Sequence, residues 1–136
     1  MKKIFYVIIL LTVIVGVLLL VIFHIKPAKE IYVENVREFK LSEYKKEITM
    51  FPMCLNVGEV ASEEDAIEKA RELWRKTWPD RLDELEEEDA REKEVSFDYE
   101  SQCWLVQGTL PEDWMGGVSN ALIKVDGTVL AVWGTQ

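Results

Sequence analysis

Residues 103–133, CWLVQGTLPEDWMGGVSNALIKVDGTVLAVW, decide the fold that we predict for this chain. Apolar, strand-forming runs are separated there by turn-forming residues. Asp126-Gly127 lies between two of these runs, and an Asp-Gly pair between β-formers is a strong hairpin signal because both turn residues tolerate positive φ. The three runs are 103–107, 118–125 and 128–133. We therefore predict an antiparallel meander.

The best-defined helix lies before these strands. Ser62 is a good N-cap, and the acidic residues 63–65 suit the positive end of the helix dipole. Pro79 stops the helix because it disrupts the backbone hydrogen bonding. Apolar residues recur at three- and four-residue steps and form one stripe: Ala66, Ile67, Ala70, Leu73, Trp74 and Trp78.

A further strand is predicted between this helix and the meander. Val95, Phe97 and Tyr99 alternate with polar residues, which is typical of a strand with one buried face. A run of strands after a helix indicates a layered α+β domain. We predict one main helix packed on an antiparallel sheet of about four strands.

The N-terminal segment predicts a transmembrane helix. Ile4–Phe23 is an uncharged run of 20 residues, which spans roughly 30 Å as a helix. The apolar core of a cleaved signal peptide is usually shorter, about 7–15 residues. We expect residues 1–26 to form an uncleaved anchor, and a cleaved signal is the alternative.

The start of the chain also indicates its location. Lys2 and Lys3 precede the apolar run, as in bacterial export signals. We expect a single-pass bacterial membrane protein with its C-terminal domain outside the cytoplasm. Residues 27–53 show only partly helical spacing and end at a break around Pro52, so we expect a membrane-proximal stalk or linker there. The domain proper would then comprise residues 54–136.

The charge of the chain bears on its partners. The formal net charge is −9, and every acidic residue lies after residue 29. A basic protein is a better partner for such a domain than nucleic acid. Residues 80–94 are the most acidic part, with Asp80 as a possible cap of a short helix that carries Leu82 and Leu85. This segment is either a solvated helix or loop, or an electrostatic surface whose contacts are Asp83, Glu84, Glu86, Glu87, Glu88 and Asp89.

A second candidate contact is the loop Glu112-Asp113-Trp114-Met115, which places an aromatic residue and a methionine beside two acids. Exposed aromatic anchors within a polar rim are typical of binding hot spots. The alternative is that Trp114 folds back over the sheet.

Residues for catalysis or metal binding are scarce. The only histidine is His24, at the end of the apolar run, so the domain lacks an imidazole base and the usual zinc ligand sets. Asp98 and the pair Glu112-Asp113 are the remaining carboxylates for acid–base chemistry, and surface positions are the simpler interpretation for them. We expect no enzyme activity, no cofactor and no metal.

The two cysteines leave two interpretations open. Cys54 and Cys103 lie 49 positions apart. In an oxidising compartment they would form a disulfide worth about 2–4 kcal/mol. Otherwise they are two small buried thiols.

The motif order of the C-terminal part resembles a known family. Trp104, the run Gly108-Thr109-Leu110-Pro111, the pair Gly116-Gly117 and the turn Asp126-Gly127 follow one another as in small NTF2-fold immunity proteins of bacterial polymorphic toxin systems. The resemblance covers about residues 54–134. It implies a small NTF2- or cystatin-like domain that binds and neutralises a cognate toxin without catalysis. The acidic stretch 80–94 and the membrane span depart from the family pattern.

A second resemblance competes with the first. A helix with Glu-Glu-x-Ala-Ile at 63–67, followed by strands that end in Val-Asp-Gly-Thr-Val-Leu at 125–130, is also similar to PepSY-type domains. That resemblance implies a membrane-tethered regulator or inhibitor of an extracytoplasmic peptidase or sensor.

Overall fold

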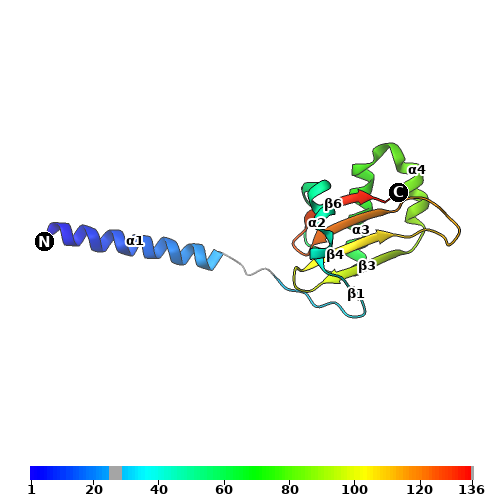
Figure 1. The fold of residues 1–136 in the computed structure, drawn as a ribbon. Coiled ribbons are helices and arrows are strands. Elements are labelled where there is room, and N and C mark those ends of the chain that lie inside the picture. The colour runs from blue at the N-terminus through cyan, green and yellow to red at the C-terminus, as the bar shows by residue number, and fades with distance from the viewer. Residues whose placement is uncertain (25–28, 136) are drawn as a thin grey trace.

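The computed structural model describes residues 1–24 and 29–135. Figure 1 shows a long N-terminal helix and a layered α+β domain. The boundary between residues 26 and 27, where we expected the anchor to end, lies outside the described residues. The elements are α1 Lys2–His24, β1 Arg37–Glu38, η1 Leu41–Tyr44, α2 Lys45–Met50, β2 Pro52–Asn56, α3 Glu63–Thr77, η2 Pro79–Arg81, α4 Leu82–Asp89, β3 Lys93–Asp98, β4 Cys103–Gly108, β5 Ser119–Lys124 and β6 Thr128–Gly134.

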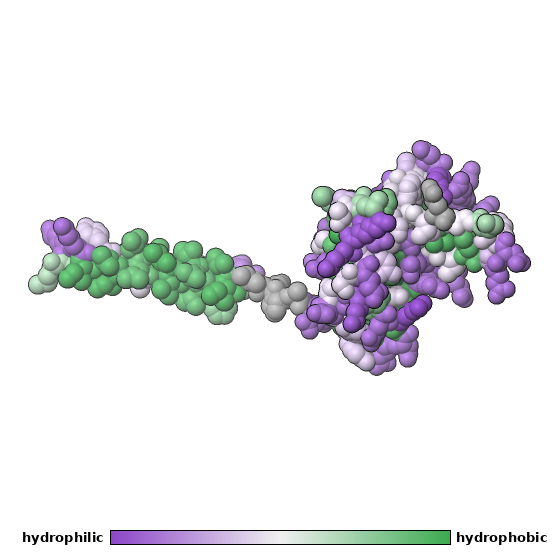
Figure 2. All heavy atoms as spheres, in the orientation of Figure 1, coloured by the Kyte–Doolittle hydropathy of each residue, from purple (hydrophilic) through white to green (hydrophobic). Residues whose placement is uncertain are grey.

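The helix α1 is long and apolar enough to cross a membrane, and a signal sequence meets the same criteria. Its 23 residues would span about 35 Å at 1.5 Å per residue. None of its residues is buried, and Figure 2 shows a continuous hydrophobic surface along it. A bilayer would supply an apolar surrounding for such a surface.

The sheet has six strands in the order β1-β3-β4-β5-β6-β2. The predicted meander is confirmed as β3 to β6, in which each strand is antiparallel to the next. The prediction of about four strands is wrong, because β1 joins β3 in parallel and β2 joins β6 in antiparallel orientation. Both missed strands are short edge strands. The Arg37–Glu38 pair has no apolar pattern, and Pro52 argued against a strand although proline is tolerated at an edge.

The predicted Asp-Gly turn is confirmed, and a tertiary contact adds to its requirement for glycine. Gly127 has φ +91°, and a Cβ placed on it would lie 2.3 Å from the Gly58 carbonyl oxygen. The Val57 amide donates to the Gly127 carbonyl at 2.9 Å. The β5–β6 turn and the turn after β2 therefore pack backbone against backbone, which leaves no room for a side chain at residue 127.

The helix α3 begins and ends as the sequence predicts. The Ser62 hydroxyl accepts from the Asp65 amide at 3.2 Å, and the helix ends before Pro79. Its apolar stripe covers one face of the sheet. Two buried indoles find carbonyl partners there: Trp74 Nε1 donates to the Asn120 carbonyl at 3.2 Å, and Trp104 Nε1 donates to the Val60 carbonyl at 3.1 Å. These bonds satisfy polar groups that would otherwise be costly to bury.

The other face of the sheet is covered by residues that we expected to form a stalk. A second apolar cluster is built from sheet residues and from the segment that contains η1 and α2. The Leu41 amide also donates to the Asp98 carboxylate at 2.8 Å. The stalk prediction for residues 27–53 is therefore wrong for the part from β1 to β2, which belongs to the domain. The members of the cluster are Cys103, Leu105, Leu122, Ala131 and Trp133, with Phe39, Leu41, Tyr44, Ile48 and Leu130 packed against them.

The cysteines are two free thiols, so the disulfide, which is one of the two interpretations left open by the sequence, is not formed. Cys54 lies on β2 and Cys103 on β4, three strand spacings apart. That separation is about 14 Å, and a disulfide requires Cα atoms within about 7 Å. The alternative of two buried thiols holds for Cys103 only, since Cys54 is exposed.

We call residues 41–50, which form η1 and α2 on the second face of the sheet, the second-face segment. Asp98 ties this segment to the sheet, and the contact leads to a prediction about the pH dependence of stability. Its carboxylate also accepts from the Glu100 amide at 3.0 Å and the Ser101 amide at 3.4 Å. Burial acts to raise the pKa of Asp98, but the hydrogen bonds from Leu41, Ser101 and Glu100 outweigh it and lower the pKa below its usual value. Asp98→Asn should therefore destabilise the chain by about 1–2 kcal/mol at pH 7.

The destabilisation caused by Asp98→Asn should be smaller at low pH. A lowered folded pKa contributes stability above the unfolded value of about 3.9, and the contribution is lost as the pH falls through the folded value. Urea unfolding of the full chain in detergent at pH 7 and pH 3 measures the free energy of unfolding of the unmodified chain and of Asp98→Asn. Asp80→Asn, at an exposed site, is the control. An equal effect of Asp98→Asn at both pH values would contradict the assignment.

Candidate functional site

The acidic segment forms a helix that is anchored to the domain. Leu85 of α4 is only 2% exposed, whereas Leu82 is 51% exposed. Asp80 does not cap α4, because it lies in the 3-10 turn η2 and the helix begins after Arg81 without a side-chain cap. Of the two interpretations of this segment, the loosely packed, fully solvated one is thus wrong for the face of α4 that carries Leu85.

Glu88 is one of the predicted contact residues, and it is buried. The side chain is 5% exposed, and its two oxygens accept from the Ser119 amide and hydroxyl, each at 2.9 Å. A Cβ on Gly108 would lie 2.1 Å from Glu88 Oε1. The carboxylate therefore occupies the space that a glycine on β4 leaves open, and it connects α4 to the start of β5.

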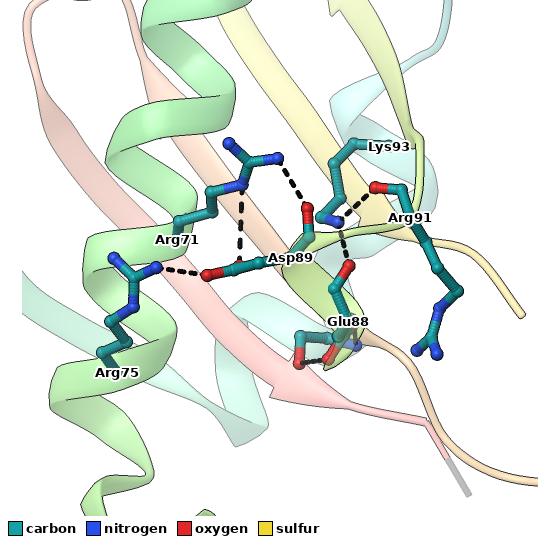
Figure 3. A network of polar contacts seen from close by, with 7 residues as sticks. Arg71, Arg75, Glu88, Asp89, Arg91 and Lys93 are labelled. Atoms are coloured by element: carbon teal, nitrogen blue, oxygen red, sulfur yellow. Dashed lines mark hydrogen bonds and ion pairs between the residues drawn. The ribbon is translucent and has the colours of Figure 1, made fainter. Parts of the chain in front are cut away.

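Asp89 is also used within the domain. Its carboxylate forms ion pairs with Arg71 and Arg75 of α3, and the Arg71 guanidinium donates to the Asp89 carbonyl at 3.0 Å. Figure 3 shows these arginines directed at the end of α4. Acidic side chains at the C-terminal end of a helix oppose its dipole, so cations supplied there offset an unfavourable arrangement.

Lys93 and Arg91 complete the connection between α4, β3 and the β4–β5 loop, and Figure 3 shows the contacts of Lys93 with Glu88 and Arg91. The Lys93 ammonium donates to the carbonyls of Glu88 and Arg91. Burial, followed by the charge of Arg71, lowers the pKa of Lys93 below its usual value. The Arg91 side chain donates to the Thr109 carbonyl at 2.8 Å, and the Thr109 hydroxyl donates to the Glu92 carbonyl at 2.7 Å.

The remaining acids of α4 are exposed, namely Asp83, Glu84, Glu86 and Glu87. Glu84 forms an ion pair with Arg81 at 2.7 Å. The Arg81 guanidinium also lies 5.8 Å from the centre of the Trp78 ring. The six predicted contact acids therefore divide into four on the surface and two, Glu88 and Asp89, that hold the helix in place.

The β4–β5 loop presents its apolar residues to solvent. Trp114 is 60% exposed and Met115 is fully exposed, and Glu112 and Asp113 beside them are exposed as well. Trp114 therefore does not fold back over the sheet. The Trp114 amide donates to the Pro111 carbonyl at 3.0 Å, so a backbone turn presents this side chain.

The two predicted segments lie at the same end of the sheet. The contacts Glu88–Ser119 and Arg91–Thr109 fasten the end of α4 and the turn after it to both ends of the β4–β5 loop, and Figure 1 shows α4 and this loop side by side. We call this the acidic–aromatic end, consisting of residues 82–87 and 112–115. It includes Leu82, an exposed apolar residue that the sequence analysis placed on the helix but not at the surface.

The chain enters the domain at the opposite end of the sheet. The Ile31 amide donates to Gln102 Oε1 in the β3–β4 turn at 2.8 Å, and Lys29 pairs with Glu59 at 3.6 Å. Strand β3 begins at the acidic–aromatic end and finishes at this turn. The acidic–aromatic end is therefore separated from the entry point by the length of the strands.

A groove of about 570 Å³ is the main alternative site. It lies beside η1, β1 and β3 and combines charges of both signs, among them Arg37, Lys40, Glu38 and Glu43. Asp98 also lines it, but three backbone amides hold this carboxylate and its pKa is lowered. The lowered pKa argues against Asp98 as the carboxylate for acid–base chemistry that the sequence left open.

Metal ligands are not gathered anywhere in residues 1–24 and 29–135, where no group of three or more His, Cys, Asp or Glu side chains could hold an ion. Comparison with protein-family models, with curated proteins and with solved structures gave no match to this chain. The function is therefore inferred from the surface of the domain.

The contact between Gly108 and Glu88 gives a stability prediction. Gly108→Ala should destabilise the chain by about 1–3 kcal/mol, because the new methyl group displaces a buried carboxylate from Ser119. In a chain that already carries Glu88→Ala, Gly108→Ala should lower the free energy of unfolding by much less. Urea unfolding of the four variants in detergent forms a double-mutant cycle. Gly116→Ala, where a Cβ meets nothing within 4 Å, is the control, and additive effects would contradict the contact.

Proposed function

We propose that this chain is a membrane-anchored, non-catalytic immunity protein that binds and neutralises a bacterial toxin through its acidic–aromatic end. The observation that carries the proposal is the joining of the exposed acids of α4 to the exposed loop with Trp114 and Met115. The partner is a protein with a basic surface.

The two parts of this surface contribute differently to binding. Exposed carboxylates on α4 attract a cationic partner and raise the association rate more than the affinity. An aromatic side chain surrounded by polar groups gains affinity when a partner desolvates it. Glu88, Asp89 and their partners hold both segments in place before binding, which reduces the ordering cost of association.

The toxin as partner, and the NTF2- or cystatin-like assignment of the domain, come from the motif resemblance of residues 54–134. In the structure three of these motif residues, Trp104, Gly108 and Gly127, have packing roles. Trp104 is fully buried, Gly108 faces Glu88, and Gly127 packs on Gly58. Partner choice would then reside in the exposed residues of α4 and of the β4–β5 loop, which can vary without disturbing the core.

The second candidate is a PepSY-like regulator or inhibitor of an extracytoplasmic peptidase or sensor. It is favoured by α1, which is long enough to hold the domain on the same membrane as such a partner. The same acidic–aromatic end would make the contact. The two candidates differ in the partner and share the surface.

The proposed orientation places the domain outside the cytoplasm, where a toxin directed at the cell wall or membrane is the fitting target. An alkaline phosphatase fusion at the C-terminus should be active, because this enzyme requires the oxidising exterior to form its disulfides. A β-galactosidase fusion at the same position should be inactive. The reverse pattern would place the domain in the cytoplasm and exclude this class of target.

The electrostatic part of the proposal is tested by charge reversal. The triple variant Asp83→Lys, Glu86→Lys and Glu87→Lys should slow association with the toxin by about tenfold or more at low salt. The matched control, Glu34→Lys, Glu38→Lys and Glu43→Lys, changes the net charge equally at exposed sites before and within the second-face segment. Surface plasmon resonance at two salt concentrations measures both. Equal effects of the two triple variants would show that only net charge matters.

The aromatic part is tested separately with Trp114→Ala. This variant should mainly increase the dissociation rate, with a loss of about 2 kcal/mol or more in binding if Trp114 is an anchor. Leu55→Ala, at another exposed apolar site, is the control. Unchanged toxin binding by Trp114→Ala would remove the loop from the contact surface.

A further inference from the structure

The chain that leads from α1 to the sheet lies on the domain without joining a strand. We call residues 29–36, which precede β1, the strap. Three of its side chains, Ile31, Val33 and Val36, pack against the core cluster on the face of the sheet that α3 covers. No residue of the strap lies in a helix or strand. The regular backbone hydrogen bonds of a sheet therefore do not hold it.

Two side chains of the β3–β4 turn hold the strap instead. Gln102 Oε1 accepts from the Ile31 amide at 2.8 Å, and Gln102 Nε2 donates to the Ile31 carbonyl at 3.4 Å. The glutamine amide thus pairs with both backbone groups of one residue, as a neighbouring strand would. Further along the strap, the Val33 carbonyl accepts from the Tyr99 hydroxyl.

The backbone conformation of Gln102 indicates that its side chain has a purpose. Its φ is +51°, in the left-handed region that favours glycine and, among other residues, asparagine and aspartate. The Val125 amide donates to the Gln102 carbonyl at 2.9 Å, a backbone contact that any residue at this position could make. Outliers of this kind are found where function requires a particular side chain. The bonds to Ile31 account for a glutamine here.

We propose that Gln102 and Tyr99 form a clamp that holds the strap on the domain and thereby keeps the domain close to the membrane. The proposal rests on the membrane anchoring by α1 and not on the identity of the partner. With the strap clamped, seven residue steps separate His24 from Ile31, and they reach at most about 25 Å. With the strap released, thirteen steps separate His24 from Arg37 of β1, and the reach grows to about 45 Å.

The clamp also determines how the acidic–aromatic end is presented. Gln102 lies in the turn between β3 and β4, and the acidic–aromatic end lies at the other end of these strands. A short tether at one end of the domain directs the other end away from the bilayer. The exposed Trp114 and the acids of α4 are then open to a partner from the aqueous side. A longer tether would remove this restriction, because the domain could rotate freely.

The strap can open while the sheet stays folded. A few side-chain hydrogen bonds and three half-buried apolar residues hold it, whereas β3 and β4 are paired along six residues each. Segments with few buried contacts open locally before the core unfolds. The effect of the clamp can therefore be measured separately from the stability of the sheet.

Limited proteolysis of the full chain in nanodiscs tests the clamp. Chymotrypsin cleaves after aromatic residues, and Tyr32 of the strap is 80% exposed whereas Trp114 is 60% exposed. Cleavage requires the backbone at the site to leave the domain, so the clamp protects Tyr32 and not Trp114. In Gln102→Gly, cleavage after Tyr32 should be about tenfold faster, and cleavage after Trp114 should be unchanged. Glycine suits the positive φ, so the sheet should remain folded.

The matched control removes a glutamine that does not touch the strap. In Gln107→Ala, the lost side chain donates to Asn120 Oδ1, and both cleavage rates should be unchanged. Tyr99→Phe removes only the hydroxyl bond to Val33 and should increase cleavage after Tyr32 by less than Gln102→Gly does. Equal cleavage after Tyr32 in the unmodified chain and in Gln102→Gly would overturn the clamp.

Energy transfer in nanodiscs tests the effect on distance. A donor dye reacts with Cys54, which is exposed, and not with Cys103, because burial, followed by the charge of Asp98, raises the pKa of the Cys103 thiol to about 12. Acceptor dyes on the lipid headgroups report the distance from the bilayer. Transfer should fall in Gln102→Gly combined with Tyr99→Phe and should be unchanged in Gln107→Ala.

Unchanged transfer in the double variant would overturn the role of the clamp in holding the domain near the membrane. Neither measurement uses a toxin. Failure of the proposed immunity function would therefore leave both expected results in place, and failure of the clamp would leave the immunity function untouched.

Discussion

The central strands of this domain carry apolar side chains on both faces, and covering these two faces is the constraint on which the structure depends. Trp104 and Ile123 point to one side, and Leu105 and Leu122 to the other. Apolar area left in water costs about 25 cal/mol per Å², so neither face can remain open. The stripe of α3 covers the first face. The second is covered by the segment that contains η1 and α2, which Asp98 ties to the sheet.

The acidic helix α4 shows how one sequence feature serves two purposes. A block of like charge favours exposure, and four of its acids are on the surface. Glu88 and Asp89 instead face the domain, where Ser119, Arg71 and Arg75 satisfy them. Burial of a carboxylate is tolerated only when such partners are present. The same contacts position the β4–β5 loop, so the stability of α4 and the presentation of Trp114 depend on one network.

The surfaces of the domain are thereby separated in space and in chemistry. Charge and exposed aromatic area lie at the end where β3 and β5 begin. The uncharged edge lies along β2, on the far side of β6. The chain enters near Gln102 at the other end of the strands. The proposed partner surface and the entry of the chain into the domain therefore use different residues.

The sequence by itself determined the elements whose signals are local. The cap at Ser62, the stripe of α3 and the Asp-Gly turn each depend on neighbouring residues, and each was correctly predicted. The alternation around Phe97 located β3, although Ser96 is buried as well, so the strand does not have a single buried face. The long apolar run that forms α1 is also a local signal of this kind. Local signals also located the acidic helix and the loop at 112–115, since composition alone marks them.

Only the tertiary structure decided which distant segments meet. Strands β1 and β2 are too short or too irregular to have a pattern of their own, and they exist because β3 and β6 offer them backbone partners. The stalk prediction was wrong for the same reason: Phe39, Tyr44 and Ile48 show a weak period, and their partners lie on β4 to β6. The division of the acids into exposed and buried ones followed from where Ser119 and two arginines lie in space. Contacts between residues far apart in the chain leave no local periodicity, so the packing of the fold had to reveal them.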